Sequence, residues 1–402
     1  AWASSMSYDG PWRHDVMRSA LVLKLLQYAP TGAIVAAPTT SLPVSADGSR
    51  NWDYRYSWTR DSAMTIRAMN QIGYPEEARG FFHFVRDILE KRGSLDIMVA
   101  IDGADVPNEV MLDHLAGHRG ARPVRIGNAA RWQTQRDIVG PLLDAASLHE
   151  QSGGRLGLRF WRQIRKLVNR AIEYAAEPDH GIWEPRAEPA HNVHSKLMIW
   201  VALDRALAIA PLFGGDRYEP TWRQARDRIH AEILERGFDR EAGTFVGTYG
   251  GSRMDASLLL LPIYDFLPPS DPRIRNTVDR VISELRDGRF MRRYRTPDGI
   301  DGDEGGFVLC GFWLAEALAL CGRLDDAIEV FQNHVSAANH LGLLAEEVDT
   351  RTGAPLGNTP QGFSHLGLIQ AAARLDLALR LRDEGVEQPP RLAFDSPQPG
   401  SS

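Results

Sequence analysis

The 402-residue sequence contains only two cysteines, Cys310 and Cys321. Both lie in one apolar run with helical periodicity, in which the eleven-residue separation places their Cα atoms about 16 Å apart, beyond the reach of a disulfide. We therefore expect two buried free thiols. Free thiols are typical of a reducing compartment, so we predict a cytoplasmic protein.

The sequence also lacks an uninterrupted apolar run of about 18 residues, and this excludes a membrane-spanning helix at the level of prediction. Its first residues do not form a basic stretch followed by an apolar one, so we expect no signal peptide. Ala1 rather than a methionine stands first. Processing or truncation of a longer chain therefore stays open.

A strong excess of one charge is missing as well. The 46 basic and 52 acidic residues give a net charge of −6 and are dispersed along the chain. This balance argues against nucleic acid or an anionic membrane as a partner. A hydrophobic content of 43% and a charged content of 24% are ordinary for a globular protein. A neutral small-molecule or oligosaccharide ligand fits this composition better.

Metal and nucleotide signatures are absent too. The 12 histidines show no ligand spacing beside an acid, and no glycine-rich phosphate loop follows a predicted strand. The segment Gly302-Asp303-Glu304-Gly305-Gly306 is rich in glycine, but its acids would repel a phosphate. We expect it to line a ligand site, and we predict no metal site and no cofactor.

Helical periodicity dominates what is present. Apolar residues recur at three- and four-residue spacing, which is typical of amphipathic helices. Pro141 and Pro262 lie inside two of the predicted helices, so these two are kinked or begin later. The predicted helices cover residues 13–28, 59–72, 75–91, 133–149, 156–176, 193–212, 218–236, 256–266, 271–286, 307–319, 324–338 and 361–381.

Short and long connectors alternate between these helices, which favours an inner and an outer ring of paired helices with the long loops at one end. The long connectors are rich in Gly, Pro, Trp and charge, and they cover residues 30–57, 93–131, 178–191, 289–306 and 340–360. Loops on a rigid scaffold often carry functional residues. We therefore expect the functional site at the end of the molecule where these loops meet.

Three segments combine carboxylates with aromatic and polar residues. They are Asn51-Trp52-Asp53-Tyr54-Arg55-Tyr56-Ser57-Trp58-Thr59-Arg60-Asp61, Gly181-Ile182-Trp183-Glu184 and Ala345-Glu346-Glu347-Val348-Asp349. Cleavage of an acetal needs a protonated acid at the leaving oxygen and a second carboxylate as base or nucleophile. Aromatic walls and fork-like polar groups hold the hydroxylated ring. The three segments together therefore point to hydrolysis of a glycosidic bond.

Further motifs stand in a fixed order along the chain. They are Tyr8-Asp9-Gly10, residues 30–43, Asn128-Ala129-Ala130, Gln135-Arg136-Asp137, His194-Ser195-Lys196, Gly302-Asp303-Glu304-Gly305 and Pro360-Gln361-Gly362-Phe363-Ser364-His365. With the three carboxylate segments, they make residues 8–380 resemble glycoside hydrolase family 15, which comprises glucoamylases, glucodextranases and bacterial trehalases. The resemblance implies an all-α toroid of six helical hairpins, (α/α)6, and an inverting, exo-acting α-glucosidase that needs no cofactor. We expect residues 1–387 to form this catalytic domain and the proline-rich residues 388–402 to form a disordered tail.

The resemblance also implies roles for the carboxylates. Glu184 matches the general acid, and an apolar wall next to Trp183 would keep it protonated because desolvation raises a carboxyl pKa. Glu346 matches the general base, and its neighbour Glu347 is the main rival. Inversion requires the two catalytic carboxyl groups to stand about 6.5 to 9.5 Å apart, with room for a water molecule.

The remaining candidates bind substrate. Trp58, Arg60 and Asp61 resemble the site for the nonreducing-end sugar, although an Arg-Asp pair at a helix start is more often a capping or surface pair. His194 and Lys196 are two residues apart on a predicted helix and do not share a face, which indicates separate roles or one structural member. Weaker candidates are Tyr54, Gln135, Asp137 and Trp183.

The sequence departs from the family in two respects. Bacterial members commonly carry a β-sandwich domain before the barrel, and a basic residue expected near Ala190 is missing. The choice among malto- or isomalto-oligosaccharides, α-glucans and trehalose therefore stays open, as do the oligomeric state and the phosphate and magnesium dependence of some trehalases in the family. The alternatives are a catalytically silent carbohydrate-binding barrel and a phosphorylase-like relative, and the presence of both catalytic carboxylates disfavours them.

Overall fold

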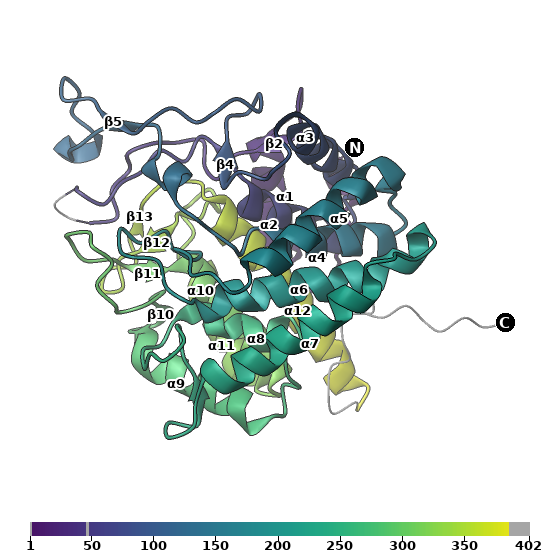
Figure 1. Ribbon diagram of the computed structural model, residues 1–402. Coiled ribbons are helices and arrows are strands. Elements are labelled where there is room, and N and C mark those ends of the chain that lie inside the picture. The colour runs from purple at the N-terminus through teal and green to yellow at the C-terminus, as the bar shows by residue number, and fades with distance from the viewer. Residues whose placement is uncertain (1, 46–47, 386–402) are drawn as a thin grey trace.

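The computed structural model describes residues 2–45 and 48–385 of the chain, so the tail predicted at residues 388–402 lies outside the described residues. Helices dominate this part of the molecule (Figure 1). Their bounds are α1 Arg13–Leu26, α2 Thr59–Gln71, α3 Pro75–Arg92, α4 Val139–Gln151, α5 Gly157–Tyr174, α6 Val193–Ile209, α7 Glu219–Arg236, α8 Leu260–Ile263, α9 Pro272–Leu285, α10 Val308–Leu320, α11 Leu324–Val335 and α12 Gly362–Asp383. Short 3-10 helices are η1 Ala3–Ser5, η2 His118–Gly120, η3 Ala129–Trp132, η4 Ala210–Phe213 and η5 Ala256–Leu259.

Two helices differ most from their predictions, and a proline lies in each. The helix expected from residue 133 begins only at Val139, which places Pro141 in the first turn of α4, where its missing N–H is not needed. The helix expected over 256–266 breaks into η5 and the single turn α8, which contains Pro262. Proline cannot donate the backbone hydrogen bond that a continuous helix requires.

Buried and half-buried helices alternate along the chain. The helices α2, α4, α6, α8, α10 and α12 are buried along most of their length, whereas α1, α3, α5, α7, α9 and α11 bury one face. In the described part of the chain, each buried helix contacts the next, from α2 through α4, α6, η5 with α8, and α10 to α12, and α12 returns to α2. This closed double ring of six inner and six outer helices confirms the predicted all-α toroid.

Two-residue strands tie the long loops together. Those that matter for the site are the pair β3–β4 and the antiparallel sheet β11–β12–β13; the labels β4, β5 and β10 to β13 gather on the left of Figure 1. The strands are β1 Gln27–Tyr28, β2 Ala33–Ile34, β3 Ser57–Trp58, β4 Met98–Val99, β5 Val110–Met111, β6 Arg125–Ile126, β7 Phe238–Asp239, β8 Thr244–Phe245, β9 Arg286–Asp287, β10 Phe290–Met291, β11 Gly306–Phe307, β12 Glu347–Val348 and β13 Pro355–Leu356.

Both cysteines are free, as expected. Cys310 is buried within α10, but Cys321 follows the end of that helix and is only half-buried, so the expectation of two buried thiols is correct for Cys310 alone. None of the helices in the described residues combines the length and the apolar composition that crossing a bilayer requires.

Candidate active site

The loop between α5 and α6 carries Glu184 in a left-handed backbone conformation, with φ of 56°. Residues other than glycine adopt this conformation at a cost of about 1–2 kcal/mol, and such strain is concentrated at functional sites. Gln133 anchors the loop, since its Nε2 donates to the backbone oxygens of Glu184 at 3.2 Å and Pro185 at 3.0 Å. The backbone thus fixes the direction of the Glu184 side chain.

One carboxylate oxygen of Glu184, Oε1, receives three contacts. Trp58 Nε1 and Gln135 Nε2 each donate a hydrogen bond of 2.9 Å to it, and Arg60 Nη2 lies 3.5 Å away. The expectation of an apolar wall around Glu184 is therefore wrong, because Trp58 turns the N–H edge of its ring toward the carboxylate and the other two neighbours are polar. All three contacts reach Oε1 rather than Oε2.

Arg60 is the centre of a buried polar cluster at the start of α2. Its Nη1 donates to Gln135 Oε1 at 2.9 Å and lies 3.4 Å from Asp137 Oδ2, while its Nε lies 3.3 Å from Asp61 Oδ1. Arg60 is only 3% exposed. The N-cap residue of α2 is Trp58, and no side chain caps this helix. Arg60 and Asp61 therefore form neither a surface pair nor a cap.

Several atoms of this cluster lack a hydrogen-bond partner among the described residues. They are Arg60 Nε and Asp61 Oδ1, which form an ion pair without hydrogen-bond geometry, and Asp137 Oδ1 and His194 Nδ1. Burial raises the pKa of Asp61 to about 7; Arg60 opposes this rise and Glu184 adds to it. Because buried polar atoms in native proteins are nearly always paired, the cluster has spare capacity to bind water or the hydroxyl groups of a ligand.

Glu346 and Glu347 make separate contacts where the chain enters β12. Tyr54 Oη donates a hydrogen bond of 2.7 Å to Glu346 Oε1, whereas the backbone N–H of Gly305 donates one of 2.7 Å to Glu347 Oε2. Successive side chains of an extended segment point to opposite sides, and this alternation separates the two rivals. Gly357 closes the other side of Glu346, since a Cβ at that position would lie 2.8 Å from Glu346 Oε2.

The two glutamates also differ in their electrostatics. Burial raises the pKa of Glu346 to about 7; the Tyr54 hydrogen bond and Arg293 lower it, while Glu304 and Glu184 add to the rise. Burial, followed by the charge of Glu304, holds the pKa of Glu347 well above its ordinary value. Burial thus shifts both carboxyl groups toward their protonated forms, and Glu346, with its pKa near 7, can exchange a proton near neutrality.

A pair of aromatic side chains connects the two carboxylates. The ring of Tyr54, which holds Glu346, packs edge-on against the ring of Trp58, which holds Glu184, with 5.5 Å between the ring centroids. Glu184 and Glu346 thus each accept a hydrogen bond from one member of the Trp58–Tyr54 pair. The required separation of 6.5 to 9.5 Å between their carboxyl groups stays a prediction.

The other predicted binding residues divide into two groups. Trp183 donates its N–H to Asp255 at 2.9 Å and packs edge-on against Phe307, and His194 Nδ1 lies 4.0 Å from Asp137 Oδ2. Burial lowers the pKa of His194 to about 3, so its ring is neutral. Lys196, in contrast, donates to the backbone oxygens of Ala175 and Glu177 and makes no contact with the Arg60 cluster in the described residues.

Sequence reasoning missed two residues beside Trp183. The Asp255 carboxylate fixes the Trp183 indole, and the Arg293 guanidinium lies over the Trp183 ring at 5.6 Å. Arg293 stands in the basic run Arg292-Arg293-Tyr294-Arg295 of the predicted long connector 289–306. The described residues contain no group of three or more His, Cys, Asp or Glu side chains that could hold a metal ion.

Solved structures with the same architecture support the fold assignment. A wild-type glycosidase matches with a TM-score of 0.72 at 21% identity, over 90% of this chain and 96% of the other. A bacterial glucoamylase complexed with acarbose also gives a TM-score of 0.72, at 14% identity, over 96% of this chain and 58% of the other. These similarities show a shared fold.

Similarity in sequence is greater. A trehalase from Mycobacterium tuberculosis is 44% identical over 95% of this chain and 57% of its own length. One from Thermoplasma volcanium is 43% identical over 95% of this chain and 61% of its own length. The chain therefore spans little more than half the length of these curated relatives. The model of the glycosyl hydrolases family 15 matches residues 10–373, and the chain belongs to this family.

Proposed function

We propose that this chain is the catalytic barrel of an inverting, exo-acting α-glucosidase whose substrate is α,α-trehalose. One observation carries the proposal: Glu184 and Glu346 are held by the two members of the Trp58–Tyr54 pair, next to the buried Arg60 cluster. Glycoside hydrolysis needs two carboxylates and a polar site that binds the sugar. Here the polar site has buried atoms that lack a hydrogen-bond partner in the described part of the chain and can bind sugar hydroxyls. The trehalases that match nearly the whole chain support this substrate.

In the proposed reaction, Glu184 is the general acid. Its Oε2 gives a proton to the glycosidic oxygen as the bond to the anomeric carbon breaks, while Trp58, Gln135 and Arg60 hold Oε1. Glu346 is the general base and takes a proton from the water that attacks the anomeric carbon from the opposite face. Tyr54 orients Glu346 for this step.

The Arg60 cluster is the proposed site for the nonreducing-end glucose. Arg60 and Asp61 bind ring hydroxyls, and Oδ1 of Asp61 and of Asp137, which accept no hydrogen bond from the described residues, supply further hydrogen bonds. His194, kept neutral by burial, can accept or donate a hydrogen bond there. We assign residues 1–387 to one catalytic domain and place it in the cytoplasm, on the basis of its free thiols.

The test is a product assay with trehalose, maltose, isomaltose and soluble starch, in which NMR follows the anomers before they mutarotate. Inverting hydrolysis of trehalose releases one β-glucose and one α-glucose, because water inverts one anomeric carbon and the other glucose leaves with its configuration intact. Release of α-glucose alone would mean retention and would refute the mechanism. Faster hydrolysis of maltose or starch would favour a glucoamylase.

Two further outcomes would identify the alternative classes. A phosphorylase would form glucose 1-phosphate and would turn over only when inorganic phosphate is added. A silent barrel would bind these sugars without turnover.

A further inference from the structure

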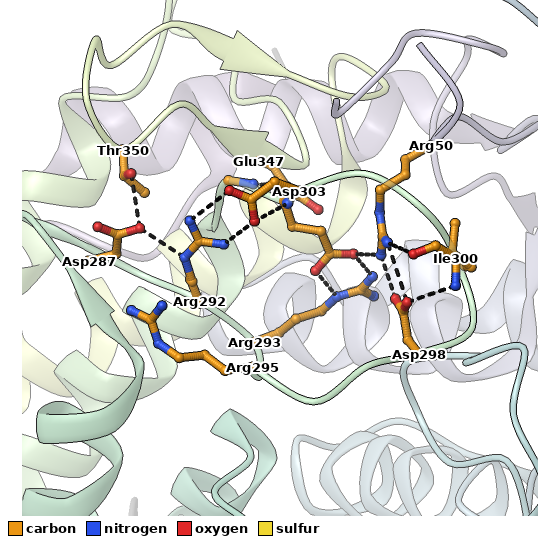
Figure 2. Close-up of polar contacts among 12 residues, drawn as sticks. Arg50, Asp287, Arg292, Arg293, Arg295, Asp298, Ile300, Asp303, Glu347 and Thr350 are labelled. Carbon is orange, nitrogen blue, oxygen red and sulfur yellow. Dashed lines mark hydrogen bonds and ion pairs between the residues drawn. The ribbon is translucent and has the colours of Figure 1, made fainter. Parts of the chain in front are cut away.

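A buried charge cluster joins two long loops beside Glu346. We call it the Arg50 clasp, and it consists of Arg50, Arg293, Asp298 and Glu304. Arg50 comes from the loop that also carries Tyr54, and the other three belong to the loop between β10 and β11. Figure 2 shows Arg50 reaching down from one loop, with Asp298 and Arg293 below it on the other.

Arg50 holds the second loop at three points. Its Nη1 donates to Asp298 Oδ1 at 3.3 Å and to the backbone oxygen of Ile300 at 3.0 Å, and its Nη2 pairs with the carboxylates of Asp298 and Glu304. Glu304 is shared, because Arg293 also pairs with it and donates from Nε to Oε2 at 2.9 Å. The Arg50 side chain is only 4% exposed, so water screens these charges weakly.

Arg293 and Glu304 are the members of the clasp that face the proposed base, Glu346. Arg293 lies over the rings of Trp183 and Phe307, at 5.6 and 5.4 Å, and the residue after Glu304 donates its backbone N–H to Glu347. The titratable groups that face Glu346 are Tyr54, Glu184, Glu304, Arg293 and the adjacent Glu347. Among these groups Arg293 is the cation, and Arg50 is the second cation bound to Glu304.

We propose that Arg50 is a positioning residue of this active site, which holds Arg293 beside Trp183 and offsets the negative charge that Glu304 directs at Glu346. This inference rests on the proposed function, because it takes Glu346 to be the general base. Arg50 acts through Glu304 and Arg293, and no contact with substrate is assigned to it.

The sign of its effect follows from the charges. A general base works in its ionised form, so kcat/KM rises with pH through the pKa of the free enzyme's base. Removing the Arg50 cation leaves more negative charge near Glu346, which raises this pKa and moves the acid limb of the profile to higher pH. Removing the Glu304 anion has the opposite effect. Both substitutions break the clasp, so a purely structural role would not give shifts of opposite sign.

The experiment compares the pH dependence of kcat/KM for trehalose in the wild type, Arg50→Gln, Glu304→Gln and Arg50→Lys. We expect the acid limb to move up by roughly 0.5 to 1 pH unit in Arg50→Gln and down by a similar amount in Glu304→Gln. In Arg50→Lys the limb should stay near its wild-type position, because the charge is kept. The double variant Arg50→Gln/Glu304→Gln should return toward the wild-type profile.

Arg292→Gln is the matched control. Arg292 lies on the same loop and pairs with Asp287 at 2.8 Å and Asp303 at 2.9 Å, at the other end of the group in Figure 2. Asp303 is 85% exposed, so solvent screens this pair and the acid limb should not move. Melting temperatures report whether each variant folds.

Four results would overturn the inference. The first is an acid limb that stays in place in both Arg50→Gln and Glu304→Gln. The second is an acid limb that moves in the same direction in these two variants. If Arg50→Gln does not fold, the downward shift in Glu304→Gln decides, and an unmoved limb there refutes the role of the clasp. A wild type that hydrolyses no α-glucoside overturns both the proposed function and this inference, whereas wild-type turnover with unmoved limbs overturns the inference alone.

Discussion

Three side-chain donors contact Glu184, and one, Tyr54, contacts Glu346. Glu347, which follows Glu346, accepts from a backbone amide instead. In the proposed reaction, Glu184→Gln removes the proton donor and Glu346→Gln removes the base. Each substitution should lower kcat by about 10²- to 10⁴-fold, because general acid and base both act in the transition state. Steady-state kinetics with circular dichroism as a folding check would measure this.

Glu347→Gln is the matched comparison for this prediction. The glutamine oxygen can still accept the hydrogen bond from the Gly305 amide, so most of the turnover should remain. If Glu347→Gln lowered kcat more than Glu346→Gln, the base would have been assigned to the wrong member of the pair. Near-normal turnover in Glu184→Gln would likewise exclude it as the acid.

Asp61 gives the sharpest separation of binding from stability at the residue scale. A hydrogen bond between a charged group and a buried hydroxyl is worth roughly 1.5 to 3 kcal/mol, so Asp61→Ala should lower kcat/KM by about tenfold or more. Loss of the buried pair with Arg60 also lowers the melting temperature, so the test compares kcat/KM of the folded fraction. Unchanged kcat/KM, with or without a lower melting temperature, would remove Asp61 from the site.

At the scale of one element, α6 carries His194, a candidate for substrate binding, and two residues later Lys196, whose contacts are structural. Lys196 Nζ donates to the last carbonyls of the α5 region, at Ala175 and Glu177, and only 1% of the residue is exposed. Lys196→Met should therefore destabilise the fold by about 2–3 kcal/mol, because buried acceptors lose a charged donor. The kcat/KM of the folded fraction should stay close to the wild-type value.

Lys166→Met on α5 is the control for this prediction, since Lys166 is exposed. Its effect on stability should stay within about 0.5 kcal/mol. Thermal unfolding and kinetics of both variants would decide. A large loss of kcat/KM in Lys196→Met at an unchanged melting temperature would place the lysine in the binding site.

The elements that the sequence predicted well are those whose signal is local. Helical periodicity located the helices; family motifs selected Glu184, Glu346 and the Arg60 cluster, whose roles stay predictions. The two-residue strands and the Arg50 clasp depend on pairing between distant segments; Arg50 and Glu304 are 254 residues apart. Arg293 was missed because its function depends on the Trp183 ring beneath it, and a basic run has no sequence signal for such a neighbour.

At the scale of the whole molecule, the ring of helices closes at a single seam. There α12 packs against both α1 and α2. Nearby, Thr39 donates its hydroxyl hydrogen to Asn358 Oδ1 at 2.9 Å. The Tyr54–Glu346 hydrogen bond also joins segments 292 residues apart.

This seam has a consequence for co-translational folding. At a translation rate of roughly 5–20 residues/s, Glu346 is synthesised about 15 to 60 s after Tyr54. During that interval the surface of α2 that later contacts α12 is uncovered. The nascent chain therefore exposes an apolar surface until late in synthesis, which is the condition that chaperones recognise. The ring that surrounds the proposed site closes only when α12 packs against α1 and α2, so a chain that ends before α12 contains Glu184 but lacks the closed barrel.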